Sequence, residues 1–113
     1  MMDTKASLDW ELSVSLSNND PSIAKELLGM LGNDLKKISV QMQKAFQEDN
    51  MYEIERLAHK LHGACCYCGV PRLKSLTQQI EQEAKTHQVK SLDALLEEMN
   101  AVIHLLEEGS YLS

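Results

Sequence analysis

The 113-residue sequence has few of the residues that build sheets and turns. Aromatic residues make up 4% of it, and it contains only 2 prolines and 5 glycines. No stretch shows the alternation of apolar and polar residues that is typical of a half-buried strand. Leu, Ala, Met, Glu, Gln and Lys are abundant instead, and most of these residues favour helices. The composition therefore predicts an all-α protein.

Positive charge and long apolar runs are also scarce. The formal net charge is −6, whereas nucleic acids and anionic membranes attract proteins with an excess of positive charge. No apolar run approaches the roughly 20 residues that span a bilayer. The polar start Met1–Lys5 does not have the pattern of a signal peptide. We expect a cytoplasmic protein that makes no nucleic-acid contact and no direct membrane contact.

The three cysteines do not form a disulfide framework. Cys65, Cys66 and Cys68 are odd in number and too close together to pair as structural bridges. Reduced thiols that pack as small apolar side chains are the simplest interpretation.

Motifs of the common enzyme classes are missing as well. The sequence contains no Gly-x-Ser-x-Gly, no His-Glu-x-x-His and no glycine-rich loop that could hold the phosphates of ATP. It therefore predicts neither a hydrolase nor an autonomous kinase.

Apolar residues at helical spacing are the main positive signal. They predict five helices, over residues 8–16, 21–48, 51–67, 71–86 and 92–108. Asp20 before Pro21, and Asn50 three residues before Glu53, are typical helix starts. Because the connections are short, successive helices should be antiparallel neighbours. We predict one domain over 1–113, with residues 1–7 disordered, built as an up-down four-helix bundle with a short N-terminal helix at one end.

Two apolar patterns define the expected core. In the second helix a seven-residue repeat is typical of a bundle seam and consists of Ala24, Leu28, Leu31, Leu35, Ile38, Met42 and Ala45. In the third helix the apolar stripe consists of Ile54, Leu57, Ala58, Leu61, Cys65 and Cys68. The short first helix carries Leu8, Leu12 and Leu16 on one face.

The third helix also carries an unusual polar turn. At about 100° per residue, His59 lies roughly 140° from Ile54 and points away from the stripe, whereas His62 lies at its edge. Gly63 follows one turn after His59 on the same face, where glycine costs a helix about 1 kcal/mol. Such a residue is kept where another molecule approaches the backbone closely. Lys60 and His62 add positive charge suited to an anionic group or an acidic partner.

Two plainer interpretations remain open at this point. His59 can be an ordinary surface histidine of a helical protein-interaction module. Alternatively, His59, His62 and Cys66 follow an i, i+3, i+7 spacing, and nitrogen and sulfur ligands suit zinc. Cys65 and Cys68 should project into the core, which leaves that metal site only three candidate ligands.

The motif His59-Lys60-Leu61-His62-Gly63, followed by Gly69 and a leucine-rich helix, resembles the histidine-containing phosphotransfer (HPt) domain of bacterial phosphorelays. The resemblance covers essentially the whole chain. The run 57–80 and the segment Leu8-Asp9-Trp10 resemble most closely the C-terminal HPt domain of BarA/GacS-type hybrid sensor histidine kinases. With the doubled Met1-Met2, this favours the cytoplasmic C-terminal part of a membrane-bound sensor kinase.

The resemblance implies that His59 accepts a phosphoryl group on Nε2. The partners would be the receiver domain of a hybrid sensor kinase and that of a response regulator, whose aspartates donate and accept the group. The chain itself would need no metal or other cofactor, since magnesium belongs to the receiver. Glu81 occupies the position that orients the histidine through Nδ1, and Gln78 is the fallback.

The same resemblance implies a docking surface around the histidine. Gly63 would leave room for the receiver, and Gly69 matches a second small position. Lys60 and His62 match two basic positions, the second of which is usually lysine or arginine, so that His62 is a departure. Arg56 lies on the face of His59 and is expected to contact the partner.

Overall fold

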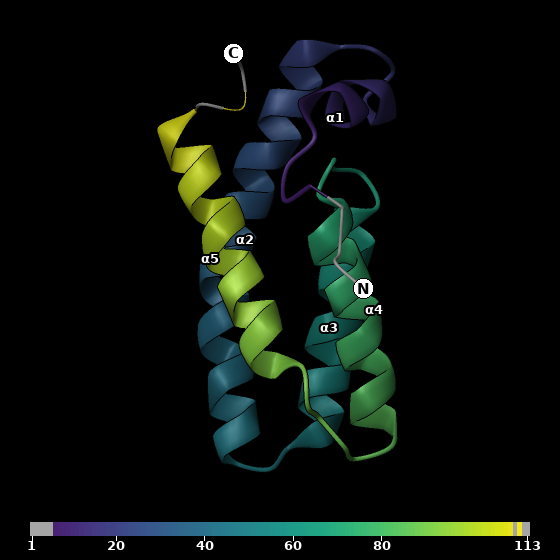
Figure 1. Cartoon of the computed structure of the whole chain (residues 1–113), viewed down its shortest axis with the longest axis vertical. Helices are drawn as coiled ribbons and strands as arrows, with labels where there is room; N and C mark the ends of the chain where they lie inside the picture. The colour runs from purple at the N-terminus through teal and green to yellow at the C-terminus, as the bar shows by residue number, and fades with distance from the viewer. Residues whose placement is uncertain (1–5, 110, 112–113) are drawn as a thin grey trace.

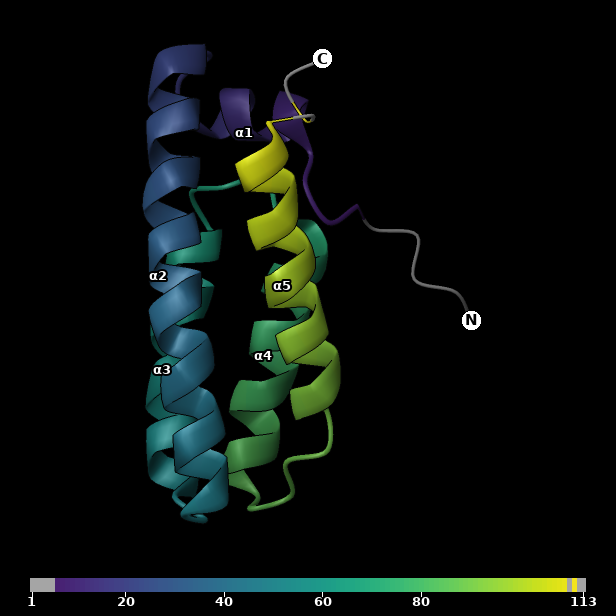
Figure 2. The ribbon, with the colours of Figure 1, turned by 90° about the vertical axis from the view of Figure 1, so that its left-hand side faces the viewer.

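The computed structural model describes residues 6–109 and residue 111. Its helices are α1 (Trp10–Leu16), α2 (Pro21–Gln47), α3 (Met51–Cys65), α4 (Pro71–Lys85) and α5 (Leu92–Glu108). Helices α2 to α5 run alternately up and down as a bundle, and α1 lies across one end (Figures 1 and 2). The described residues contain no strand. The predicted all-α four-helix bundle with a short N-terminal helix is confirmed.

Local polar contacts explain where three of the helices begin. The side chains of Asp9, Asp20 and Asn50 accept hydrogen bonds from backbone N–H groups in the first turns of α1, α2 and α3. Helix α1 therefore begins at Trp10 rather than at residue 8. Helix α3 ends at Cys65, two residues earlier than predicted, because the chain turns after it to reach α4.

The bundle core follows the predicted apolar patterns. All seven residues of the α2 repeat and all six of the stripe that begins in α3 are buried. Burying one large aliphatic side chain is worth about 1.5–3 kcal/mol relative to leaving it exposed. The two patterns therefore determine which faces of α2 and α3 turn inward.

Helix α1 does not bury the leucine face that its sequence suggests. Leu12 and Leu16 are 37% and 43% exposed, whereas Ser13 is buried. The Ser13 hydroxyl oxygen accepts a hydrogen bond from the Gly69 N–H at 2.9 Å. The Asp9 N–H donates to the Gly69 carbonyl at 2.7 Å. Polar contacts with the turn after α3 thus orient α1, and its leucines remain at the surface.

The segment before α1 is tied to the start of α4. The Arg72 N–H donates to the Ala6 carbonyl at 3.3 Å, and Arg72 Nη1 donates to the Ser7 hydroxyl at 3.4 Å. Arg72 Nη1 also lies 3.6 Å from the buried carboxylate of Glu98 on α5. Residues 1–5 of the segment predicted to be disordered lie outside the described residues, but Ala6 and Ser7 have these defined partners.

Candidate functional site

His59 and Glu81 meet across the contact between α3 and α4. His59 Nδ1 lies 3.0 Å from Glu81 Oε2. A carboxylate only accepts hydrogen bonds, so Nδ1 carries the hydrogen and Nε2 of the neutral ring keeps its lone pair. The His59 side chain is 76% exposed and the Glu81 side chain 15%. The arrangement therefore presents a nucleophilic nitrogen to solvent on a ring that a nearly buried carboxylate orients.

Glu81 and Gln78, the two candidates for orienting His59, lie in different places. Glu81 contacts His59, whereas Gln78 lines a separate hollow one turn closer to α1. Glu81 Oε2 also lies 3.9 Å from Lys85 Nζ, one turn further along α4.

A surface hollow of about 330 Å³ adjoins the histidine. It is lined by Tyr52, Glu55, Arg56, His59 and Glu81. Arg56 therefore lies beside His59 as predicted, but it is engaged on its own helix. Its Nε and Nη2 donate to the two carboxylate oxygens of Glu53 at 2.6 and 2.9 Å. This paired hydrogen bond lowers the pKa of Glu53 and raises that of Arg56.

The next turn of α3 leaves the surface open. Gly63 is exposed, and a Cβ added to it would meet no atom within 4 Å outside its own helix. The fold of this chain therefore does not require glycine there.

The two basic residues of this turn differ in exposure. Lys60 is exposed, whereas His62 is half-buried. The Nε2 atom of His62 is buried and has no hydrogen-bond partner among the described residues. Of the two predicted basic residues, Lys60 is the one that faces solvent.

A second hollow, of about 340 Å³, lies on the α1 side of Gly63. It is lined by Leu12, Leu16, Cys65, Cys66, Cys68, Pro71, Lys74, Ser75 and Gln78. Cys66 is the residue that caps the C-terminal end of α3. The sequence does not mark Leu12 and Leu16 as surface residues, because their helical spacing is that of a buried face.

Gly69 does not belong to this surface. It is buried, and a Cβ added to it would collide with the Asp9 carbonyl oxygen and lie 2.6 Å from the Ser13 hydroxyl. Its small size is explained by the close approach of α1 rather than by room for a partner.

The alternative metal site is not assembled. Among residues 6–109 and 111, no three His, Cys, Asp or Glu side chains come together as a group that could hold a metal ion. The cysteines are free, and burial raises the pKa of Cys65 to about 12 and that of Cys68 to about 11. These two thiols therefore stay protonated and serve packing.

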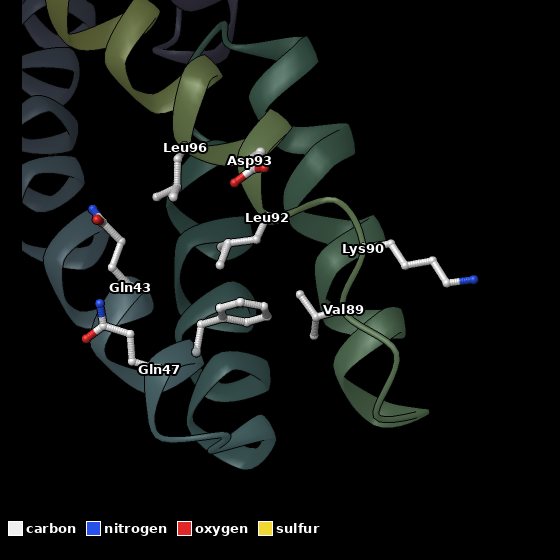
Figure 3. A pocket seen from close by; sticks show the side chains of 8 residues that line it. Gln43, Gln47, Val89, Lys90, Leu92, Asp93 and Leu96 are labelled. Carbon is white, nitrogen blue, oxygen red and sulfur yellow. The ribbon is translucent and has the colours of Figure 1, made fainter.

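A third hollow, of about 290 Å³, lies at the end of the bundle opposite α1. Figure 3 shows its side chains, which come from α2, the loop before α5 and α5 itself; they are Gln43, Phe46, Gln47, Val89, Lys90, Leu92, Asp93 and Leu96. None of them belongs to α3 or α4, so this hollow is separate from the His59 site.

Comparison with known proteins agrees with this geometry. The model of the Hpt domain family matches residues 26–109. The chain belongs to the Hpt domain family. It is 34% identical over 86 residues to the signal transduction histidine-protein kinase BarA of Escherichia coli K12, which covers 76% of this chain and 9% of the kinase. It is 34% identical over 104 residues to the sensor protein GacS of Pseudomonas syringae, which covers 90% of this chain and 11% of that protein.

Two solved structures have the same fold. The Hpt domain of a Shewanella hybrid histidine kinase matches with a TM-score of 0.84 and 31% identity, over 91% of this chain and 92% of the other. Histidine-containing phosphotransfer protein B of Pseudomonas aeruginosa PAO1 matches with a TM-score of 0.76 at 20% identity, over 91% and 93% of the two chains. The predicted resemblance to the Hpt domains of BarA/GacS-type kinases is confirmed. This Hpt domain is a histidine phosphotransfer module of two-component signalling.

The Hpt domain spans only about a tenth of the curated relatives named above. None of its described helices is long and apolar enough to cross a membrane.

Proposed function

We propose that this Hpt domain carries a phosphoryl group on Nε2 of His59 between aspartates of two receiver domains. The observation that carries the proposal is the 3.0 Å contact between His59 Nδ1 and Glu81 Oε2 on a ring that is 76% exposed. A fixed tautomer and an accessible Nε2 are what a nucleophilic histidine needs.

In the proposed transfer step one bond to phosphorus forms as another breaks, and no cofactor bound to this chain takes part. The Nε2 lone pair attacks the phosphorus of an aspartyl phosphate, the bond between phosphorus and the aspartyl oxygen breaks, and the aspartate leaves as a carboxylate. Because Nδ1 keeps its hydrogen, the phosphorylated ring carries positive charge, which the Glu81 carboxylate offsets. The reverse step returns the phosphoryl group to a second aspartate. In this proposal magnesium is supplied by the receiver and neutralises the transferred group.

The surface around His59 suits a protein partner. Gly63 leaves the backbone of α3 uncovered, and the two hollows lie on either side of it along the α3–α4 face. One hollow contains His59 and the exposed Tyr52, while the other contains the exposed Leu12 and Leu16. Exposed aromatic and aliphatic side chains around a polar centre are typical of protein interfaces. We propose that a receiver domain covers both hollows and brings its aspartate to Nε2.

The similarity to BarA and GacS supports more specific partners. We propose that the donor is a receiver domain of a hybrid sensor kinase, that the acceptor belongs to a response regulator, and that the exchange takes place in the cytoplasm.

Incubation with a phosphorylated receiver tests the proposal. The wild-type chain should take up a label that is labile to acid and stable to alkali, and His59→Gln should not. His104→Gln is a matched control, because His104 is also exposed and its Nε2 lies 2.7 Å from Glu108 Oε1. Unlabelled wild type, or equal labelling of wild type and His59→Gln, would instead favour a non-catalytic interaction module.

A further inference from the structure

Glu81 is shared between two positively polarised neighbours. The oxygen that accepts from His59 Nδ1 at 3.0 Å also lies 3.9 Å from Lys85 Nζ. Glutamate followed by lysine four residues later is the favourable order for such a pair on a helix. Glu81 is 15% exposed and Lys85 46%, so the ammonium group reaches the carboxylate from its solvent side.

The other charged side chains that line the hollow beside His59 do not balance the charge of Glu81. Glu55 and Glu81 both line the hollow beside His59. Arg56, the cation that lines it with them, is hydrogen-bonded through two nitrogens to Glu53. An incoming phosphoryl group is anionic and would be repelled by two carboxylates, and repulsion is stronger where one of them is nearly buried. Lys85 is the cation placed against the carboxylate that touches the histidine.

We propose that Lys85 is a positioning residue of phosphotransfer that acts through Glu81. Its ammonium group weakens the repulsion between the Glu81 carboxylate and the incoming phosphoryl group, while Glu81 keeps its hydrogen bond to Nδ1. This inference rests on the function proposed above. Because Lys85 is partly exposed, its effect should be modest and should weaken as salt screens the charges.

Replacing Lys85 by an uncharged residue of similar length tests the inference. Lys85→Met should accept the phosphoryl group from a receiver about two- to five-fold more slowly than wild type at low salt. Lys85→Arg should restore the rate. Lys36→Met is the matched control, because Lys36 is an exposed lysine 3.5 Å from Glu107 on the α2–α5 side of the bundle. It removes the same charge and should leave the rate unchanged.

Two further measurements separate an electrostatic role from a structural one. The ratio of the wild-type rate to the Lys85→Met rate should fall toward one at high salt. It should also shrink in a Glu81→Gln background, where residue 81 has no charge to offset. A slowing of equal size at all salt concentrations, or one that persists undiminished with Gln at 81, would overturn the inference.

A small phosphoramidate donor separates this inference from the proposed function. It transfers to histidine without receiver docking, and Lys85→Met should slow it as well. A wild-type chain that takes label from neither donor would overturn both proposals. Normal labelling of the wild type, with Lys85→Met equal to it at low salt, would overturn the role of Lys85 alone.

Discussion

The carboxylate of Glu81 reaches across from α4 to accept a hydrogen bond from His59 on α3, at 3.0 Å. The histidine is thereby oriented by a neighbouring helix rather than by its own. By contrast, His104 contacts Glu108 on its own helix α5, and it does so through Nε2. A histidine bonded in that way has no free Nε2 to offer, whereas His59 has.

Removing the Glu81 carboxylate should slow phosphotransfer without unfolding the bundle. A hydrogen bond to a charged group contributes about 1.5–3 kcal/mol. If most of that is retained in the transition state, Glu81→Ala should slow labelling of His59 about ten-fold or more. Glu81→Gln keeps an acceptor and should lose less. The measurements are initial rates of labelling from a phosphorylated receiver and thermal unfolding. A rate equal to that of wild type would remove Glu81 from the mechanism.

A bulky residue at position 63 should block receiver docking while leaving the fold intact. A side chain on Gly63 meets no atom within 4 Å outside its own helix, and replacing a helical glycine should stabilise the domain by up to about 1 kcal/mol. Gly63→Gln should therefore unfold no earlier than wild type, but lose transfer from the receiver and keep labelling by phosphoramidate. Gly29→Gln is the control, since Gly29 of α2 is equally unobstructed. Normal receiver transfer by Gly63→Gln would argue against docking over this turn.

Gly69 should matter for stability instead. A methyl group there would overlap the Asp9 carbonyl oxygen and crowd Ser13. Overpacking of this kind typically costs about 1–3 kcal/mol, so Gly69→Ala should lower the free energy of unfolding measured in urea. Gly63→Ala, which adds the same methyl group in open space, should not lower it. Equal stability of the two variants would contradict the close packing of α1 on the turn after α3.

Glu83 should make the stability of the domain depend on pH. Its burial opposes ionisation, but hydrogen bonds outweigh this effect and lower its pKa below 4.5. Its Oε1 accepts from the backbone N–H of Lys90 and Ser91 at 2.8 and 2.9 Å, and Ser91 Oγ donates to its Oε2 at 2.7 Å. A carboxylate with a lowered folded pKa stabilises fully above its unfolded pKa, and this contribution disappears as pH falls through the folded value.

The matched variant for Glu83 is Glu83→Gln. It should be less stable than wild type at pH 7, and the difference in unfolding free energy should narrow as pH falls below about 4.5. Urea unfolding at pH 7 and at pH 3 measures this. A difference that is independent of pH would mean that the charge of Glu83 does not stabilise the α4–α5 connection.

The contacts of Glu83 also show where sequence reasoning fell short at a helix end. Ser91 directly precedes α5 and is a residue type that commonly caps helices, but its hydroxyl donates to Glu83 and makes no cap hydrogen bond. A cap residue can be recognised in the sequence by its type. The sequence alone does not show that a carboxylate from the preceding helix competes for the hydroxyl.

Periodicity and local chemistry determined most of the fold. Apolar spacing in α2 and α3 identified the buried faces, because a residue's place around a helix depends only on its number in the chain. The same periodicity predicts that His59 and Gly63 face outward, and both are exposed. The role of Glu81 was inferred from family resemblance, since nothing in local spacing links residues 22 positions apart.

Tertiary packing decided the rest. Whether Glu81 or Gln78 meets His59 depends on how α3 and α4 are rotated against each other. Gly69 was read as part of a docking surface, yet it is buried because α1 crosses the bundle end at that turn. The exposure of Leu12 and Leu16 has the same origin, since polar contacts to Gly69 set the orientation of α1. The sequence by itself thus determined the helices, the inner faces of α2 and α3, and the outward histidine. Only the packing of the helices against one another decided what orients that histidine and which surface surrounds it.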